Sequence, residues 1–327
     1  MLTAVALGSL ALPSCSGGSS LPNSGVSAPA SHTQSSARRL PQTLGENAQA
    51  AALYVSDGTA KSIFRFARNP GGTLVAPPGS SLVLPYNPGP IAIGRHGNLF
   101  VTDQGNESIE VYAKGATGYQ QPSRTLLLPF APSSVAVDAN GYEYVGGYSN
   151  GFVAVYKPGA HGMAGTIQRI ALPDGHPTIN GVAVDPSGNL YVSDSNEVSE
   201  FGTPTTNPTL LRAIIGSGEL NQPTGMAVAP KSGELYVANA GDGNILAYSP
   251  TANGKSHPDR TISSSNPSLV LPVAIALGGS ALYSTSGSKL YGTPSVFLLD
   301  AQRGHQTPKQ VVTGNYLAAP VGVALGP

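Results

Sequence analysis

The chain has 327 residues, of which 40% are hydrophobic and only 10% are charged. Its 17 Lys and Arg balance 17 Asp and Glu, so the formal net charge at pH 7 is zero. This neutrality argues against a nucleic-acid-binding protein, which should carry a basic face, and against a polybasic membrane-surface protein. A single cysteine excludes an intramolecular disulfide and a cysteine-rich zinc site.

Residues 1–14 have the pattern of a signal peptide. Leu2–Leu12 is an apolar run that is too short to span a bilayer as a helix but suits a signal-peptide core. The residues that follow, Pro13-Ser14-Cys15, resemble the end of the bacterial lipobox, and Cys15 is the only cysteine of the chain. This resemblance implies that residues 1–14 are removed and that Cys15 is lipidated. The alternative is an ordinary secretion signal with an incidental cysteine.

Residues 15–50 are predicted to form a tether. They are rich in Ser, Gly, Ala and Pro and show no hydrophobic period, which is typical of a flexible linker. The several acyl chains of a lipidated Cys15 would hold such a chain stably in a membrane. We therefore expect an exported lipoprotein of the outer membrane or cell surface, in contact with the membrane through its lipid anchor only. If Cys15 is not lipidated, the protein is expected to be secreted.

A repeat of about 46 residues runs through residues 51–327. Each copy contains a short apolar strand, a turn with Gly, and a strand that carries an aromatic residue followed in most copies by Val. The aromatic residues are Tyr54, Phe100, Tyr144, Tyr191, Tyr236 and Tyr283. Two more short strands follow, as at 152–156 and 167–170. Four short strands per repeat of this length are typical of a β-propeller blade, so we predict an all-β fold.

The length of the repeat region predicts six blades. Six repeats of about 46 residues need about 276, close to the length of residues 51–327. The region begins with a second strand at about 52–57 and ends with a first strand at about 320–325. Pairing of these two strands would complete one blade and remove the open sheet edges. The sequence therefore predicts a six-bladed β-propeller of four-stranded blades, closed by its C-terminal strand.

The repeat also carries a family resemblance. Its pattern, Pro-x-Gly-Val-Ala-Val followed by Gly-Asn-Leu-Tyr-Val-Ser-Asp, resembles the NHL-repeat propellers and the related lactonase and virginiamycin-lyase propellers. The resemblance covers residues 51–327 and implies the fold more than an activity, because this scaffold carries enzymes, sensors and adhesive modules. Lactonase-like propellers bind a divalent metal near the axis, which would nominate Asn180, Asp194 and Asn239 in this chain. Lyase-like propellers use a channel His and Glu, a pair that this sequence does not place.

Candidate binding residues lie where second strands end and first strands begin. A propeller pocket is expected on this face. Four of these residues stand three positions after the repeated aromatic: Asp57, Asp103, Asp194 and Asn239. Their oxygens could bind Ca²⁺, but Asp and Asn after a strand also commonly accept hydrogen bonds from the backbone amides of their own turn. His176 and Asn180 precede a first strand and break the repeat, and they complete the candidate set.

Two functions are compatible with these residues. The neutral composition and the lack of a convincing catalytic set favour a monomeric binding or scaffold module for a protein or glycan of the cell envelope. The alternative is a metal-dependent lactonase-like hydrolase or lyase, with its site on the propeller axis and a divalent cation such as Ca²⁺ as cofactor. One histidine is a narrow basis for general acid–base catalysis. A divalent ion on the axis would discriminate between the two.

Overall fold

The structure is a computed structural model that describes residues 52–327 apart from 174, 217 and 288–292. The chain divides into two units, residues 1–41 and residues 42–327, and every described residue belongs to the second. The predicted signal peptide at 1–14, the candidate lipidation site Cys15 and the tether at 15–50 lie outside the described residues. Within the described part of the chain, no helix is long and apolar enough to cross a membrane.

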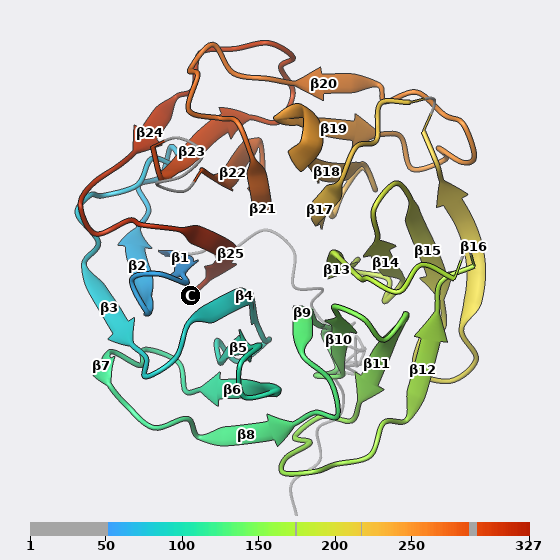
Figure 1. Ribbon diagram of the computed structural model, residues 1–327. Helices are drawn as coiled ribbons and strands as arrows, with labels where there is room; N and C mark the ends of the chain where they lie inside the picture. The colour runs from blue at the N-terminus through green and yellow to red at the C-terminus, as the bar shows by residue number, and fades with distance from the viewer. Residues whose placement is uncertain (1–51, 174, 217, 288–292) are drawn as a thin grey trace, which may run out of the picture. The chain divides into compact units, whose positions relative to one another are not determined.

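Six β-sheets surround a common axis as the blades of a propeller (Figure 1). Within each blade the order runs from the innermost strand to the outermost. Blade 1 contains β25 (Pro320–Gly326), β1 (Ala52–Asp57), β2 (Ser62–Ala67), β3 (Ser80–Val83) and the short β7 (Gly118–Tyr119). Blade 2 contains β4 (Pro88–Ile93), β5 (Leu99–Asp103), β6 (Ser108–Tyr112) and β8 (Arg124–Leu127). Blade 3 contains β9 (Pro132–Val137), β10 (Glu143–Gly147), β11 (Phe152–Tyr156) and β12 (Gln168–Ala171).

The second half of the ring repeats this order. Blade 4 contains β13 (Gly181–Val184), β14 (Leu190–Ser193), β15 (Val198–Gly202) and β16 (Thr209–Ile214). Blade 5 contains β17 (Pro223–Val228), β18 (Leu235–Asn239), β19 (Asn244–Tyr248) and β20 (Arg260–Ile262). Blade 6 contains β21 (Pro272–Gly278), β22 (Ala281–Ser286), β23 (Ser295–Asp300) and β24 (Gln310–Val312). The predicted all-β, six-bladed architecture is confirmed, with a single 3₁₀ turn at Ala240–Asp242 in the described residues.

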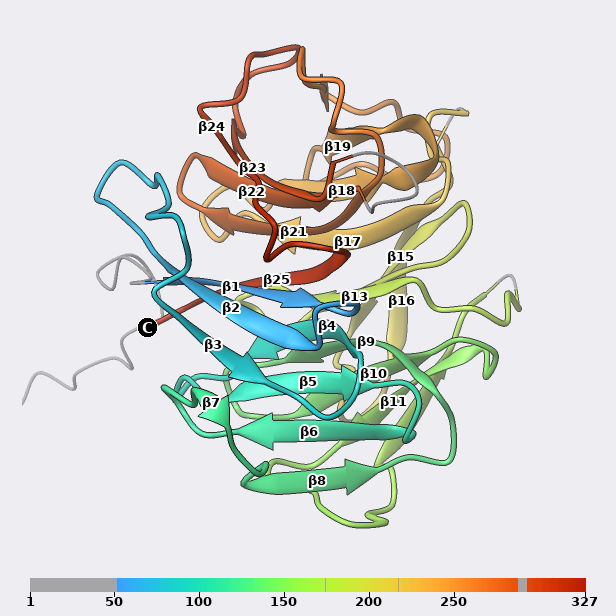
Figure 2. The same ribbon diagram turned by 60° about the vertical axis from the view of Figure 1, so that its left-hand side comes forward.

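The ring closes as the sequence predicts. β25, the last strand of the chain, pairs antiparallel with β1, the first, so that Leu53 lies opposite Leu325 and Val55 opposite Val323. Figure 2 shows these two strands side by side above blade 2. Blade 1 is thus built from both ends of the propeller, and closure pairs β1 on both of its edges, with β25 on one side and β2 on the other.

The hydrophobic core consists of six clusters, each shared by two neighbouring blades. Each repeated aromatic is buried in one of these clusters, which explains why this position recurs. One inner-strand alanine contributes to each cluster: Ala276, Ala227, Ala136, Ala183, Ala324 and Ala92. Apolar burial between blades, worth roughly 25 cal/mol per Å², is therefore what holds the ring together.

The inner strands approach one another most closely at glycines. A Cβ atom added at Gly225 in β17 would lie 2.7 Å from the Cα atom of Ala274 in β21, a separation that real side chains do not adopt. Gly181 in β13 is placed in the same way against the carbonyl oxygen of Thr224. These glycines let six strands converge around a narrow axis.

Candidate binding site on the propeller axis

A cavity of about 380 Å³ lies on the axis, between the innermost strands of all six blades. Its volume is at the low end of the range of roughly 300–1,000 Å³ that is usual for small-molecule sites. Each blade contributes one or more apolar side chains to the wall. These include Ile91, Val135, Val182, Met226, Ile275 and Val323. Because these strands are widely separated in the sequence, the cavity exists only in the closed ring.

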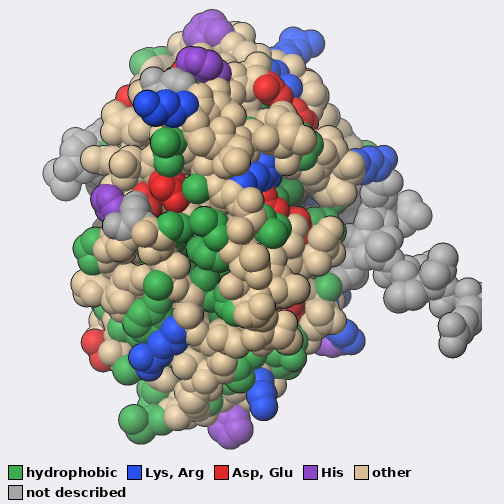
Figure 3. Space-filling view, turned by 90° about the vertical axis from the view of Figure 1, so that its right-hand side faces the viewer, with side chains coloured by type: hydrophobic (Ala, Val, Ile, Leu, Met, Phe, Trp, Pro, Cys, Tyr) green, Lys and Arg blue, Asp and Glu red, His purple; other side chains and the backbone are tan. Residues whose placement is uncertain are grey.

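The wall of this axial cavity is uncharged. Among the described residues that line it, none is Asp, Glu, Lys, Arg or His. Tyr148 also lines it, and burial raises the pKa of its hydroxyl further above the ordinary value. Charged side chains lie instead on the outer surface, where they are scattered, as one face of the molecule shows (Figure 3). The cavity therefore suits an uncharged ligand, since a buried charge would find no counter-charge in its wall.

Asn180 supplies a preoriented hydrogen-bond acceptor. Its Nδ2 donates to the carbonyl oxygens of Asp194, at 2.6 Å, and of Pro223, at 3.1 Å. Two carbonyl acceptors fix which end of the amide is the nitrogen, so the side-chain orientation is determined. No described residue donates to its Oδ1. Asn180 lines the cavity, and its oxygen is the polar atom left for a ligand.

Other polar groups of the wall have unused hydrogen-bonding capacity. The hydroxyl of Ser134 in β9 is buried and has no hydrogen-bond partner within the described structure. The exposed amide side chains of Asn87 and Gln104 lie at the wall as well, from the segments before β4 and after β5. The Ser134 hydroxyl is turned toward Gly146 in β10 and is closed to solvent, so Asn87 and Gln104 are the polar groups that a ligand in the cavity could reach.

Tyr148 is an aromatic surface beside the cavity. It follows β10, and 45% of the residue is exposed although it lines the cavity. Its backbone is held on both sides, because its amide donates to the Ala131 carbonyl and its carbonyl accepts a hydrogen bond of 2.8 Å from the Thr178 hydroxyl. An exposed ring on a fixed backbone loses little conformational freedom when it packs on a ligand.

The repeated acidic residues mainly hold turns. Asp57 is fully buried, and its carboxylate accepts hydrogen bonds from the backbone amides of Ala60, Ala318 and Ala319. Asp103 and Asp194 accept in the same way from their own turns, at the amides of Asn106, Asn196 and Glu197. None of the three lines the axial cavity. Their oxygens are positioned for backbone amides of the blade rather than for a shared ligand.

Asn239 and His176 also lie outside the cavity wall. Asn239 is fully buried, accepts from the amide of Asn221 at 2.7 Å, and donates to the carbonyl of Glu219 at 2.8 Å. His176 is half-buried in the segment between β12 and β13. Of the six residues that the sequence nominates, the structure places only Asn180 in the wall. Over the described part of the chain, no three His, Cys, Asp or Glu side chains are grouped so that they could hold a metal ion.

Six polar or aromatic residues of the described wall were not predicted from the sequence: Tyr148, Gln104, Asn87, Ser133, Ser134 and Thr224. One signal was present for the first of them. Blade 3 has Gly147 where four other blades carry Asp or Asn and blade 6 carries Ser286, and a tyrosine follows it. A Cβ atom at Gly147 would lie 2.7 Å from side-chain atoms of Phe130 and Asn150, so a larger residue there would require these side chains to move. This interruption of the repeat marks the one blade whose turn presents a ring to the cavity.

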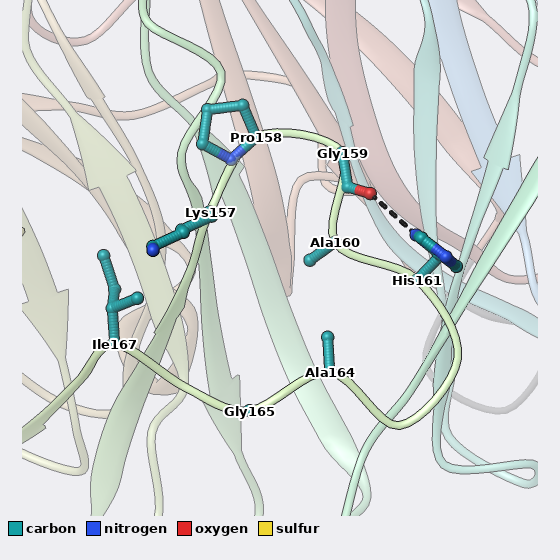
Figure 4. A pocket seen from close by; sticks show the side chains of 8 residues that line it. All are labelled: Lys157, Pro158, Gly159, Ala160, His161, Ala164, Gly165 and Ile167. Carbon is teal, nitrogen blue, oxygen red and sulfur yellow. Dashed lines mark hydrogen bonds between the residues drawn. The ribbon is translucent and has the colours of Figure 1, made fainter. Parts of the chain in front are cut away.

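A second hollow, of about 350 Å³, lies in the loop between β11 and β12 (Figure 4). All of its lining residues fall within residues 157–167, and the ring Nδ1 of His161 lies 3.1 Å from the Gly159 carbonyl oxygen. The same loop pairs with blade 2, where Leu126 is bridged to Gly162. Because one loop forms the whole wall and its glycines serve this packing, we assign no binding role to the hollow.

These features define the chain as a six-bladed β-propeller with a neutral axial cavity. No protein-family model and no curated protein matches the sequence. Among solved structures, a chain from a nidogen/laminin complex is similar with a TM-score of 0.66 and 21% identity, over 84% of this chain and 97% of the other. A streptogramin B lyase is similar with a TM-score of 0.54 and 14% identity, over 84% and 87%.

Virginiamycin B lyase from Staphylococcus aureus is a further match, with a TM-score of 0.52 and 13% identity over 82% of this chain and 86% of the other. These likenesses confirm the expected propeller architecture and the expected similarity in fold to lyase propellers. At such low identity the fold is what they share.

Proposed function

We propose that the chain is an exported, lipid-anchored binding module whose axial cavity receives an uncharged group of a protein or glycan partner in the cell envelope. The neutral wall of the cavity is the observation that carries this proposal. The buried carboxylates that could have formed a polar centre are instead paired with turn amides, as Asp57 is with three of them. Uncharged donors, acceptors and apolar side chains remain to contact a partner.

The N-terminal pattern supplies the cellular part of the proposal. An anchored Cys15 followed by a tether at 15–50 would hold the propeller near a membrane surface while leaving its faces accessible. One of the similar solved chains comes from a complex of nidogen with laminin, so the fold is found in protein–protein assemblies. The proposed chain would act as a monomer that binds through one face of the ring.

Filling the cavity tests the proposal. Val273 is half-buried in the cavity wall, and Val273→Trp should occupy space that a partner needs. Leu211 is exposed on the outer strand β16, so Leu211→Trp is a matched control away from the axis. The full chain is used to capture components of envelope extracts, which are identified by mass spectrometry. We expect a component that Leu211→Trp retains and Val273→Trp loses; equal recovery by both variants would contradict axial binding.

The alternative to a binding module is a metal-dependent hydrolase or lyase. Thermal melting with EDTA, and then with Ca²⁺, Mg²⁺, Mn²⁺ or Zn²⁺, separates the two. A cation at a hundredfold its dissociation constant would stabilise the fold by about 2.7 kcal/mol, a shift of several degrees. We expect the same melting temperature under all conditions. A shift with one ion that Val273→Trp abolishes would favour the enzyme and justify assays with lactones.

A further inference from the structure

We propose that the ligand of the axial cavity is a neutral glycan, bound through a terminal sugar ring that stacks on Tyr148. This inference rests on the proposed binding function and adds the chemical class of the ligand. Three properties of the wall carry it: amide and hydroxyl groups with unused hydrogen-bonding capacity, an exposed aromatic ring beside apolar side chains, and the absence of charge among the described lining residues.

The polar atoms of the wall match sugar hydroxyls. A hydroxyl both donates and accepts, and side-chain amides and hydroxyls can do the same in return. Oδ1 of Asn180 is held as an acceptor by the two bonds that its Nδ2 makes. The exposed amides of Asn87 and Gln104 make no side-chain hydrogen bond within the described residues. A purely apolar ligand would leave these groups unpaired, which costs free energy.

The apolar part of the wall suits the C–H faces of a sugar ring. Tyr148 presents an exposed ring, while Ile91, Val182 and Met226 lie on the wall from three blades. Aromatic rings give a large contact area at low entropic cost. The volume of about 380 Å³ admits a small ring and its substituents, but not a folded protein element. This favours a glycan end over an inserted helix or hairpin.

The uncharged wall selects against acidic sugars and phosphates. A carboxylate or phosphate entering the cavity would lose water without gaining a cation, since the described lining contains no Lys, Arg or His. Backbone carbonyls of the inner strands, such as those that accept from Asn180 and Thr224, further disfavour an anion. Neutral hexose and N-acetylhexosamine units are therefore the expected class.

The experiment measures binding of defined saccharides to the full chain by calorimetry. The probes are maltotriose, cellotriose, mannotriose and chitotriose, the neutral oligosaccharides released from the envelope of the source cell, and trigalacturonate as the charged comparator. Tyr148→Ala removes the ring, and Gln104→Ala removes an exposed amide that makes no side-chain bond within the described residues. Tyr119→Ala is the matched control, because Tyr119 in β7 is 84% exposed and lies outside the cavity wall. Melting temperatures confirm that each variant is folded.

We expect at least one neutral probe to bind and trigalacturonate not to bind. Tyr148→Ala should weaken that binding by about ten-fold and Gln104→Ala by several-fold, with Tyr119→Ala unchanged. Equal binding by Tyr148→Ala, equal binding of trigalacturonate, or no binding of any neutral probe would overturn the glycan inference. If no saccharide binds but the capture experiment still recovers an envelope protein that Val273→Trp loses, the proposed binding function stands without the glycan inference. If no saccharide binds and the capture experiment recovers nothing that Val273→Trp loses, the binding function and the glycan inference both fail.

Discussion

At the scale of single residues, Asp57 links the two ends of the propeller. Its carboxylate accepts hydrogen bonds from Ala60 in the turn after β1 and from Ala318 and Ala319 just before β25. The Asp57 side chain is fully buried, so water does not compete with these amides for its carboxylate oxygens. Hydrogen bonds to a charged group contribute about 1.5–3 kcal/mol each, which makes this carboxylate one of the strongest local contributions to closure.

Asp57→Ala should therefore destabilise the fold strongly. Three backbone amides, of which that of Ala318 is buried, would lose their acceptor, and we expect a loss of at least about 2 kcal/mol, or roughly 4–8 °C in melting temperature. Thermal unfolding followed by circular dichroism measures the loss. Asp259→Ala is the control, because Asp259 is exposed in the link before β20. Equal melting temperatures for the two variants would mean that Asp57 does not hold the closure.

Glu143 gives the stability a pH dependence. It is fully buried at the start of β10, and its Oε1 accepts a bond of 2.8 Å from Arg124 in blade 2. Burial raises the pKa of this carboxyl to about 7, against the opposing effect of Arg124. Because the unfolded carboxyl titrates near 4.5, the folded chain holds an extra proton between pH 4.5 and pH 7. Stability from this group therefore falls as pH rises through that window.

Glu143→Gln should remove this decline. The wild-type chain is expected to melt at a lower temperature at pH 8 than at pH 5, with a contribution on the order of 3 kcal/mol from this carboxyl. The amide variant should show a much smaller difference. Glu234→Gln is the control: burial opposes the shift, but Arg260 lowers the pKa of Glu234, so this residue stays charged over the same range. An unchanged pH dependence in Glu143→Gln would refute this assignment.

At the scale of elements, neighbouring blades are also connected at the outside of the ring, where links pair with outer strands. A link of one blade adds a short parallel bridge to the outer edge of the blade before it, as β7 does at β3. The same bridges join Ile214 to Gly254 and Ser264 to Gln306. These contacts cover part of each exposed sheet edge, which protects it from pairing with other chains.

β25 is the element on which closure depends. Deleting residues 319–327 removes the inner strand of blade 1 and its apolar contacts with blades 2 and 6, including those of Val323 and Leu325. We expect a loss of most of the melting cooperativity and of most of the stability. Calorimetry of the shortened chain measures this. Adding a synthetic peptide of residues 319–327 should restore part of the transition, and an unchanged melting temperature without it would refute the closure.

At the scale of the whole molecule, the proposed anchor places the cavity at a membrane surface. If Cys15 carries lipid, the tether of residues 15–50 sets how far the propeller reaches. The neutral surface would then neither attract nor repel anionic headgroups strongly, because charges are few and balanced. Binding would depend on the ligand at the axis rather than on the membrane.

Cys15→Ser tests the anchor. We expect the variant to lose incorporation of radiolabelled palmitate and to move from the membrane fraction to the soluble fraction of cells that express it. Ser14→Ala, which leaves the cysteine in place, should keep both label and fractionation. Continued labelling of the Cys15→Ser chain would show that the lipobox interpretation is wrong.

Much of the fold could be predicted from local sequence patterns. The repeated aromatic and the following apolar positions have a period that only a four-stranded blade explains, and all six aromatics are buried between blades. Closure was predictable because the first repeat lacks its inner strand and the last residues supply it. Strand bounds differed by about a residue, as at β12, which is predicted at 167–170 and runs over Gln168–Ala171.

The site was far less predictable. Polar residues that recur with the repeat, such as Asp57 and Asn239, drew attention but serve turns. Ser134 and Gln104 occur once each in their positions, so no pattern singles them out. The signal for Tyr148 is the Gly147 that interrupts the repeat just before it. These residues come together because six inner strands meet at the axis. Strand pairing within one blade carries no information about which residues of the other blades lie across the cavity.

The sequence by itself thus determined the all-β class, the number of blades and the way the ring closes, because strand alternation and turn residues act over a few residues and repeat with a constant period. Only the tertiary structure decided which side chains line the axis and that their common surface is uncharged. Those side chains come from segments as far apart as Asn87 and Val323, and their neighbourhood is created by closure of the ring.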